Sequence, residues 1–283
     1  MKIIHFEVNG KRKIGEVIGD YVTEMENYFS EPKGESYQIN EIKQVPFLPS
    51  AIICTLTNSY IMTGAESKEE AREMLGSPKF FLKLPSIVIG NKDTIYAPKS
   101  GIRPEVEIGV VIKENTKNID KNQVKDYILG YVVFNDVTAP GEFKKDWYYA
   151  KRRDPNDGEI KKMLIRGNHF RNKNRDTFAP LGSIIVTPED VKIEGLKMRS
   201  YYAGNVIQEG TTDEFVFSIE EIISELSKIV TIPKFSIVST GTVGYREASE
   251  ASEYKIDAIN GLMEVEVEKI GKLSNPVEIE KNL

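Results

Sequence analysis

Short apolar runs that alternate with polar residues dominate the chain, and they predict a fold made mainly of strands. The first two runs, residues 3–8 and 12–18, alternate in this way on either side of Asn9 and Gly10, a pair typical of a β-hairpin turn. Most later apolar runs are short, rich in β-branched residues and bounded by Gly, Pro or Asn, as strands are. We therefore expect a mainly β fold of the α+β class.

Helical periodicity appears in two segments. Ser67 precedes the first, residues 68–75, and Glu70 follows it by three positions, so the two side chains can form a capping box; Gly76 marks the end. In residues 218–229 isoleucine and leucine recur at helical spacing, which predicts an amphipathic helix. We expect its apolar stripe to pack into the core rather than to bind a cofactor.

A polar connection separates the first apolar runs from the rest of the chain. It is punctuated by Pro32, Gly34 and Pro46, residues that mark turns and loops. A chain of 283 residues is long enough for one large core or for a small and a large domain. We expect residues 1–48 to form a small N-terminal β domain and residues 49–283 to form the large one.

Composition and charge exclude several classes of function. The net charge of -5 and the pI near 5.4 offer no basic face for nucleic acid. Cys54 is the only cysteine, which excludes a disulfide framework and a four-cysteine metal site and fits a reducing compartment. No stretch approaches the roughly eighteen apolar residues of a membrane span. We expect a cytoplasmic protein that binds neither nucleic acid nor membranes.

Three carboxylates in two strand-like runs are the best candidates for chemistry. Glu105 and Glu107 are two positions apart, so a strand projects them from the same face, and Asp136 follows a second apolar run. Like charges this close are costly unless a cation or strong hydrogen bonds compensate them. Since oxygen ligands favour hard cations, we expect Mg2+, with Mn2+ or Ca2+ as alternatives. A solvated acidic face on an edge strand is the other interpretation.

Seven segments, taken in order, resemble the catalytic domain of the fumarylacetoacetate hydrolase family. The resemblance implies the coiled, mixed β-sheet roll of that family for residues 49–283, a metal site at the three carboxylates, a small anionic substrate and a homodimer. Seven matches in the same order are not expected by chance. The matching segments are residues 80–90, 104–112, 126–139, 173–182, 204–208 with Thr211, 239–242 and 265–277.

The resemblance also implies roles for residues outside the carboxylates. Lys83 and Lys173 fall on family lysines that could hold an anionic substrate or move a proton. In an unrelated chain, both would be expected at the surface. Gln208 and Thr242 match positions that contact substrate in the family. We therefore expect the two lysines to act in catalysis and the other two residues to bind substrate.

One departure from the family pattern falls on the group that activates water. Family hydrolases carry Asn-Tyr-x-x-His after the first core strand, but this chain has Met62 in place of the histidine. Tyr60 keeps a place in the expected substrate site. Glu66 is the candidate for the missing catalytic role, and His169, four residues before Lys173, is an alternative that could approach the site.

A second departure removes the family's substrate-binding arginine, because the segment after Asp136 reads Thr138-Ala-Pro-Gly141. An insertion near 142–165 follows, and it is rich in charged and aromatic residues. Although a charged run is usually a solvated face, long insertions between active-site segments tend to be lids or interface loops. We expect Arg152 or Arg153 to replace the missing arginine, and the insertion to form part of a dimer interface.

These features together predict a metal-dependent enzyme that acts on small 2-keto acids or 1,3-diketo acids. The leading expectation is hydrolysis of a carbon-carbon bond in an acylpyruvate-like substrate through a metal-stabilised enolate. The missing histidine favours the first alternative, a lyase or isomerase of the same family such as a 2-keto-3-deoxy sugar acid dehydratase. A non-catalytic protein that binds 2-keto acids is the second alternative.

Overall fold

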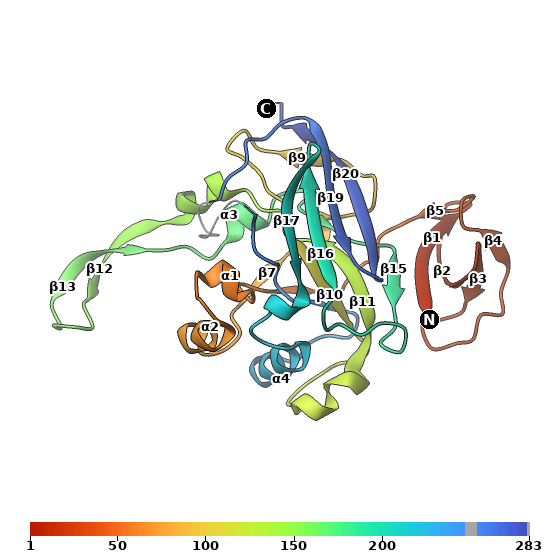
Figure 1. The fold of residues 1–283 in the computed structure, drawn as a ribbon, viewed down its shortest axis with the longest axis horizontal. Helices are drawn as coiled ribbons and strands as arrows, with labels where there is room; N and C mark the ends of the chain where they lie inside the picture. Colours follow the sequence, from red (N-terminus) through yellow and green to blue (C-terminus); the bar gives the residue numbers. More distant parts are fainter. Residues whose placement is uncertain (247–253, 282–283) are drawn as a thin grey trace.

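Two packed sheets form the body of the molecule (Figure 1). The computed structural model describes residues 1–246 and 254–281. Within them the large sheet runs in the order β4 (Ser36–Gln38), β3 (Tyr21–Met25), β2 (Lys11–Ile18), β1 (Lys2–Val8), β15 (Ile184–Val186), β11 (Ile128–Asn135), β10 (Val106–Ile112), β18 (Ile237–Ser239), β6 (Ile52–Thr55) and β7 (Phe80–Lys83), with β5 (Lys43–Gln44) paired to β1. The smaller sheet runs β17 (Asn205–Thr211), β16 (Lys197–Tyr202), β19 (Gly261–Val267), β20 (Gly271–Ile279) and β9 (Ile95–Ala97).

The main hydrophobic core fills the space between the two sheets. Ile108 and Val133 on the large sheet and Met198 and Val265 on the small sheet belong to this core, which also includes the apolar stripe of α4 (Ile219–Ile229). A second core covers the other face of β10 and β11. Every residue of these two strands is buried, which explains why they read as continuous apolar runs rather than alternating ones.

The N-terminal strands form the predicted hairpin and extend the large sheet. Asn9 and Gly10 join β1 to β2 with positive φ angles of 51° and 73°, the conformation that a two-residue hairpin turn requires. β1 also pairs with β15, so the N-terminal strands continue the large sheet, and Ile4, Phe6 and Val22 give them a small core of their own. The division into two domains stays a prediction.

Both predicted helices are confirmed. α2 (Lys68–Leu75) begins after Ser67, whose side chain accepts from the Glu70 backbone N–H. The expected capping box is shifted by one residue, because the Glu70 carboxylate accepts from the Glu66 backbone N–H. α4 has the complete box between Ser218 and Glu221. The single turns α1 (Tyr60–Thr63) and α3 (Phe170–Lys173) have no periodic signal, because four residues are too few to repeat.

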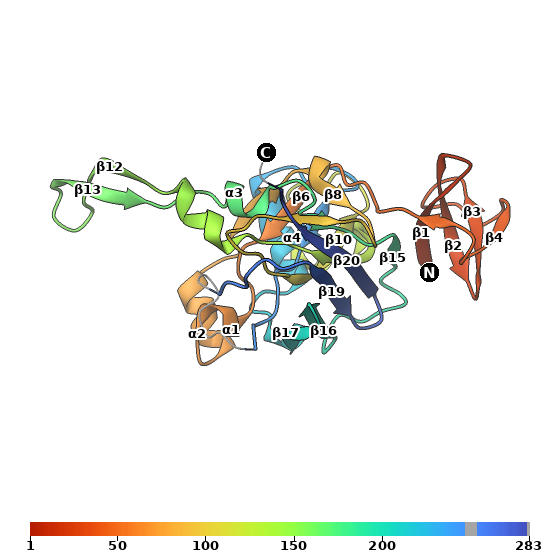
Figure 2. The ribbon, with the colours of Figure 1, turned by 90° about the horizontal axis from the view of Figure 1, so that it is seen from above.

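The insertion forms an arm that projects from the body. After a 3-10 segment (Pro140–Asp146), β12 (Tyr148–Arg153) and β13 (Ile160–Ile165) make an antiparallel pair. Figures 1 and 2 both show the arm extending away from the sheets, at the opposite end from the N-terminal strands. Within the described residues its strands pair only with each other.

The remaining elements are short, and the mainly β prediction is confirmed. β8 (Val88–Ile89) and β14 (Ala179–Pro180) form a parallel pair. Further 3-10 segments span Pro85–Ile87, Lys121–Tyr127 and Thr212–Glu214. In the part of the chain that is described, no helix has the length and apolar character needed to cross a membrane.

Candidate metal centre

Glu105, Glu107 and Asp136 lie together where β10 begins and β11 ends. The two strands are antiparallel, with Val106 opposite Asn135, so the residues flanking these positions meet at one end of the sheet. The Asp136 backbone N–H donates to the Glu105 carbonyl at 2.9 Å, which fixes this junction. One oxygen of each carboxylate lies within 4.8 Å of the others, and all three residues are buried.

Two buried lysines reach the same carboxylates from outside this strand pair. Lys83 ends β7 and donates to Asp136 Oδ1 at 2.5 Å and to the Val137 carbonyl at 3.0 Å. Lys173 ends α3 and bridges two carboxylates, with 2.5 Å to Asp136 Oδ2 and 2.8 Å to Glu105 Oε2. The structure thus brings both predicted lysines into direct contact with the carboxylates.

The two lysines differ in how firmly they hold their protons. Burial lowers the pKa of Lys83, and this effect outweighs the attraction of Asp136. Burial acts on Lys173 in the same direction, but Asp136 and Glu105 overcome it and raise the Lys173 pKa. Lys173 is therefore a permanent cation, while Lys83 releases its proton more readily than an ordinary lysine.

Arg103 and Thr138 complete the contacts of Glu105, and the sequence interpretation missed both. Arg103 places Nη2 at 3.0 Å and Nε at 3.1 Å from Glu105 Oε1, and the Thr138 hydroxyl donates to the same oxygen at 2.9 Å. A signal for Arg103 was present. It lies two positions before Glu105, so the alternation that pairs the two glutamates also places it on their face.

The two glutamates experience opposite electrostatic environments. Burial acts against the charge of Glu105, but the cations of Lys173 and Arg103 outweigh it and lower the Glu105 pKa. Burial raises the pKa of Glu107 well above its ordinary value, and the neighbouring charge of Asp136 raises it further. Glu107 is therefore the carboxylate of this group that most lacks a positive partner.

The residues present fit a hard divalent cation. Glu107 Oε2 is buried and has no hydrogen-bond partner among the described residues. A buried oxygen without a partner is costly, which is expected where a ligand completes its coordination. The three carboxylates supply only oxygen donors, which suit Mg2+, Mn2+ or Ca2+.

Gln208 and Thr242 form hydrogen bonds that hold the backbone at the start of β10. Gln208 Oε1 accepts from the Val106 N–H at 3.0 Å and from the Ser200 hydroxyl at 2.9 Å. Its Nε2 donates to Thr242 Oγ1 and to the Val243 carbonyl, both at 2.7 Å. The Thr242 hydroxyl in turn donates to the Val106 carbonyl at 2.8 Å. These bonds fix the backbone between the two glutamates; contact with a substrate stays a prediction for both residues.

The other predicted site residues lie outside the carboxylate contacts. Tyr60 is the half-buried first residue of α1, and Met62 in the same turn packs against the second core. Glu66 is exposed in the link between α1 and α2. Arg152 is exposed near the tip of the arm, where it lies opposite Lys161 in the register of the two strands. The roles predicted for Tyr60, Glu66 and Arg152 stay predictions.

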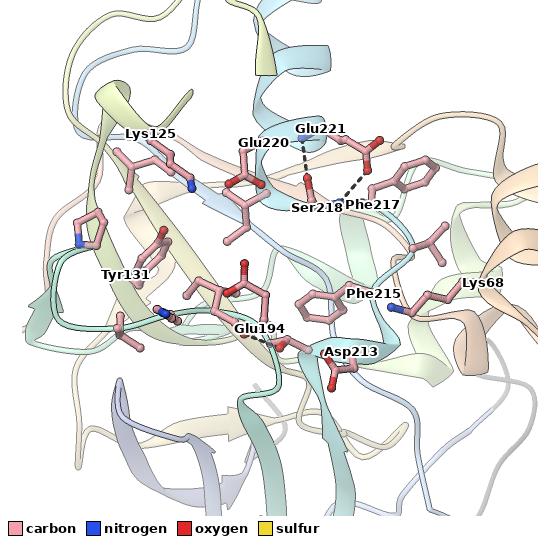
Figure 3. Close-up of a pocket in the computed structure, with 18 of the residues that line it drawn as sticks. Lys68, Lys125, Tyr131, Glu194, Asp213, Phe215, Phe217, Ser218, Glu220 and Glu221 are labelled. Carbon is pink, nitrogen blue, oxygen red and sulfur yellow. Dashed lines mark hydrogen bonds between the residues drawn. The ribbon is translucent and has the colours of Figure 1, made fainter. Parts of the chain in front are cut away.

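A cavity of about 890 Å³ lies apart from the carboxylates, between β11, the start of α4 and residues 188–194 (Figure 3). Figure 3 shows Lys125 and Tyr131 on one side of it and Phe215 and Lys68 on the other. None of its lining residues belongs to the group of carboxylates and lysines. The chemistry described above is therefore not located in this cavity.

Comparison with protein families places most of the chain in one family model. Residues 51–278 match the model described as fumarylacetoacetate (FAA) hydrolase C-terminal. A fumarylacetoacetate hydrolase domain-containing protein 2 homolog of Dictyostelium discoideum is 30% identical, with 83% of this chain and 73% of that protein covered. The mitochondrial oxaloacetate tautomerase fahd2 of Xenopus laevis is 29% identical, with 71% of this chain and 58% of that protein covered.

Solved structures share the fold over the whole chain. A 5-carboxymethyl-2-hydroxymuconate delta-isomerase from Mycobacterium smegmatis gives a TM-score of 0.77 at 24% identity, covering 99% of this chain and 100% of that one. The maleylpyruvate hydrolase of Sphingobium sp. SYK-6, solved with manganese(II) and pyruvate, gives a TM-score of 0.71 at 18% identity with the same coverage. The predicted β-sheet fold is confirmed by these neighbours.

Proposed function

The chain belongs to the fumarylacetoacetate hydrolase family, and we propose that it is a metal-dependent enzyme that enolises small 2-keto acids. One observation carries the proposal: three buried carboxylates and two buried lysines meet at one point. A 2-keto acid presents adjacent carboxylate and carbonyl oxygens, which suit a divalent cation flanked by ammonium groups. The Xenopus relative, described as an oxaloacetate tautomerase, supports this substrate class.

Glu105, Glu107 and Asp136 would hold the cation. A bound divalent cation supplies Lewis acidity toward the carbonyl oxygen of the substrate. Lys173, which keeps its proton because Asp136 and Glu105 raise its pKa, would orient the substrate carboxylate. Burial lowers the pKa of Lys83, so its ammonium would give up a proton more readily than that of an ordinary lysine.

Hydrolysis of an acylpyruvate is the second candidate. The fold shared with maleylpyruvate hydrolase favours it. However, hydrolysis needs a group that takes a proton from water. The turn that carries the family histidine has Met62 instead, packed against the second core. Proton transfer at C3 requires no attacking water, so we rank enolisation first.

The test compares the two reactions with the same protein. With Mg2+ or Mn2+ present, exchange of the C3 protons of pyruvate with deuterium, followed by NMR, should be faster than hydrolysis of acetylpyruvate. EDTA should stop the exchange. Hydrolysis faster than exchange would reverse the ranking, and thermal stabilisation by pyruvate without either reaction would indicate a binding protein.

Calorimetry provides a readout that does not depend on turnover. Glu107→Gln should abolish Mg2+ and Mn2+ binding, because it removes the charge of the carboxylate whose buried Oε2 has no hydrogen-bond partner among the described residues. Glu278→Gln, which changes an exposed glutamate at the end of β20, is the matched control and should bind as the wild type does. Equal metal binding by both variants would refute the proposed metal site.

A further inference from the structure

We propose that His169 is the proton-transfer residue of this site and takes the C3 proton of the bound 2-keto acid. The inference rests on the enolisation proposed above. The chain contains only two histidines. His5 is buried in β1, with Nδ1 3.1 Å from the Ser183 carbonyl and Nε2 2.8 Å from the Tyr28 hydroxyl, so both of its nitrogens are engaged. Of the two histidines, His169 is therefore the one with a ring nitrogen available to transfer a proton.

Contacts with one phenylalanine connect His169 to Lys173, the lysine that bridges two of the carboxylates. It immediately precedes α3, the turn that ends with Lys173. The Lys173 ammonium lies 5.1 Å from the centre of the Phe81 ring, and the His169 ring lies 6.1 Å from the same ring, centre to centre. The imidazole therefore lies one aromatic ring away from the ammonium that bridges Glu105 and Asp136.

The imidazole is held in a defined orientation. Phe143 stacks on it, with ring centres 4.5 Å apart and planes 22° from parallel. The buried side-chain amide of Asn172 lies 3.4 Å from Nδ1, and its Oδ1 has no other partner among the described residues. A half-turn of this amide presents Oδ1 to a proton on Nδ1. His169 also has a φ of 62°, a backbone strain that often marks functional sites when it occurs outside glycine.

Nε2 is the free nitrogen of this arrangement. No hydrogen bond to it is formed by the described residues, and the side chain is only half-buried. Burial lowers the pKa of His169, and the cations of Lys173 and Arg103 lower it further against the opposing charges of Glu105 and Asp136. The imidazole is therefore neutral at pH 7 and can accept a proton.

The proposed step transfers one proton and conserves charge. The Nε2 lone pair forms an N–H bond as the C3–H bond of the substrate breaks. The electrons of that bond form the C2–C3 double bond, and the carbonyl electrons move onto oxygen. The imidazolium, with Nδ1–H donating to Asn172 Oδ1, then returns the proton to the enolate oxygen to give the enol, or to carbon to give the keto form. No oxidant or second substrate is required.

The first experiment measures pyruvate exchange and pyruvate binding in the same variants with Mg2+. His169→Gln should lower the rate constant of C3 exchange by about 100-fold or more, the contribution expected of a positioned acid-base group. The dissociation constant for pyruvate should change by less than about twofold, because an interaction made only in the transition state is lost. Added imidazole should restore part of the rate. His5→Gln is the control and should exchange normally at pH 8.

The outcomes separate this inference from the proposed function. Absence of metal-dependent exchange in the wild-type protein would refute enolisation itself. Exchange in the wild type and equally in His169→Gln would overturn the role of His169 and leave Lys83 as the candidate base. Loss of pyruvate binding together with exchange would show that His169 holds the substrate rather than moves the proton.

A second variant tests the role of Asn172 in positioning the imidazole. In Asn172→Asp a carboxylate faces Nδ1, so the imidazolium is stabilised and the His169 pKa rises. The acid limb of the rate profile for exchange should then move to higher pH, while a residue that only maintains the fold would change the rate without moving the limb. An unmoved limb contradicts the assignment.

Discussion

At the scale of single residues, the site combines carboxylates that have positive partners with one that does not. Asp136 is contacted by both lysines, and Glu105 by Lys173 and Arg103. Glu107 has no ion pair and an oxygen without a partner among the described residues. A buried charge is tolerated only while it is compensated. The carboxylates should therefore differ sharply in what their loss does to stability.

Asp136→Ala should lower the free energy of unfolding by about 3–5 kcal/mol, because it leaves the fully buried ammonium of Lys83 without its counter-charge. Glu107→Gln should cost little, or even stabilise the metal-free protein, since it removes a repulsive neighbour of Asp136. Urea denaturation in EDTA measures both variants. Similar losses for the two would mean that the ion pairs do not determine the stability of this cluster.

His5 should make the protein less stable in acid. Burial lowers its pKa from 6.5 to about 4. Between these values the unfolded chain binds a proton that the folded protein does not, so stability is intact above pH 6.5 and falls as the pH approaches 4. The full effect corresponds to roughly 3 kcal/mol. Urea midpoints from pH 8 to 4 should fall less steeply for His5→Gln than for the wild type; parallel curves would contradict this.

At the scale of elements, the sequence predicts best what neighbouring residues decide. The hairpin at Asn9 and Gly10 and the helix after Ser218 are local events, and both were predicted from local signals. The strands β10 and β11 were recognisable because they are buried on both faces. The spacing of two positions between Glu105 and Glu107 predicted that both side chains project from the same face of the strand. By contrast, Lys173 reaches the cluster through α3, a single turn without periodicity, and only the family resemblance indicated it.

Long-range contacts explain what could not be predicted. Gln208 fixes the start of β10 across a gap of about one hundred residues, and nothing local to either segment encodes that contact. The paired strands of the arm, β12 and β13, contain runs of charged residues where strands usually alternate apolar and polar positions. The sequence therefore indicated an insertion but not its strand pairing. The position of His169 depends on Phe81 and Phe143, which come from two other elements.

The capping box of α4 makes a measurable contribution. The Ser218 side chain accepts from the Glu221 N–H at 3.2 Å, and the Glu221 carboxylate accepts from the Ser218 N–H at 3.0 Å. Ser218→Ala should lower the free energy of unfolding by about 1 kcal/mol, whereas Ser218→Asp keeps a capping oxygen and should remain near the wild type. Thermal and urea unfolding measure both. An equal loss in both variants would assign the effect to something other than the cap.

At the scale of the whole molecule, the arm is the part that the body does not stabilise. A two-stranded hairpin alone in water is marginally stable at best. This one exposes Tyr149, Ile160 and Leu164. Its strands carry five basic residues and the turn between them three acidic ones, so residues 148–165 have a net charge of +2, although the whole chain has a net charge of -5. Apolar side chains on a basic arm complement the acidic body of a second copy, and we propose that the arm packs there in a homodimer.

Light scattering should therefore give a mass of about twice the 32.0 kDa chain at micromolar concentration. Tyr149 and Leu164 face each other across the arm, so replacing both with serine removes the apolar pair from one face without touching the carboxylates. This variant should dissociate to a monomer, and because the contact is partly electrostatic, the wild-type dimer should weaken as salt is raised. Tyr21→Ser changes an exposed tyrosine in β3, a strand at the opposite end of the molecule (Figure 1), and this variant should remain a dimer. A monomeric wild-type protein would exclude the dimer, and a double-serine variant that stays dimeric would place the interface elsewhere.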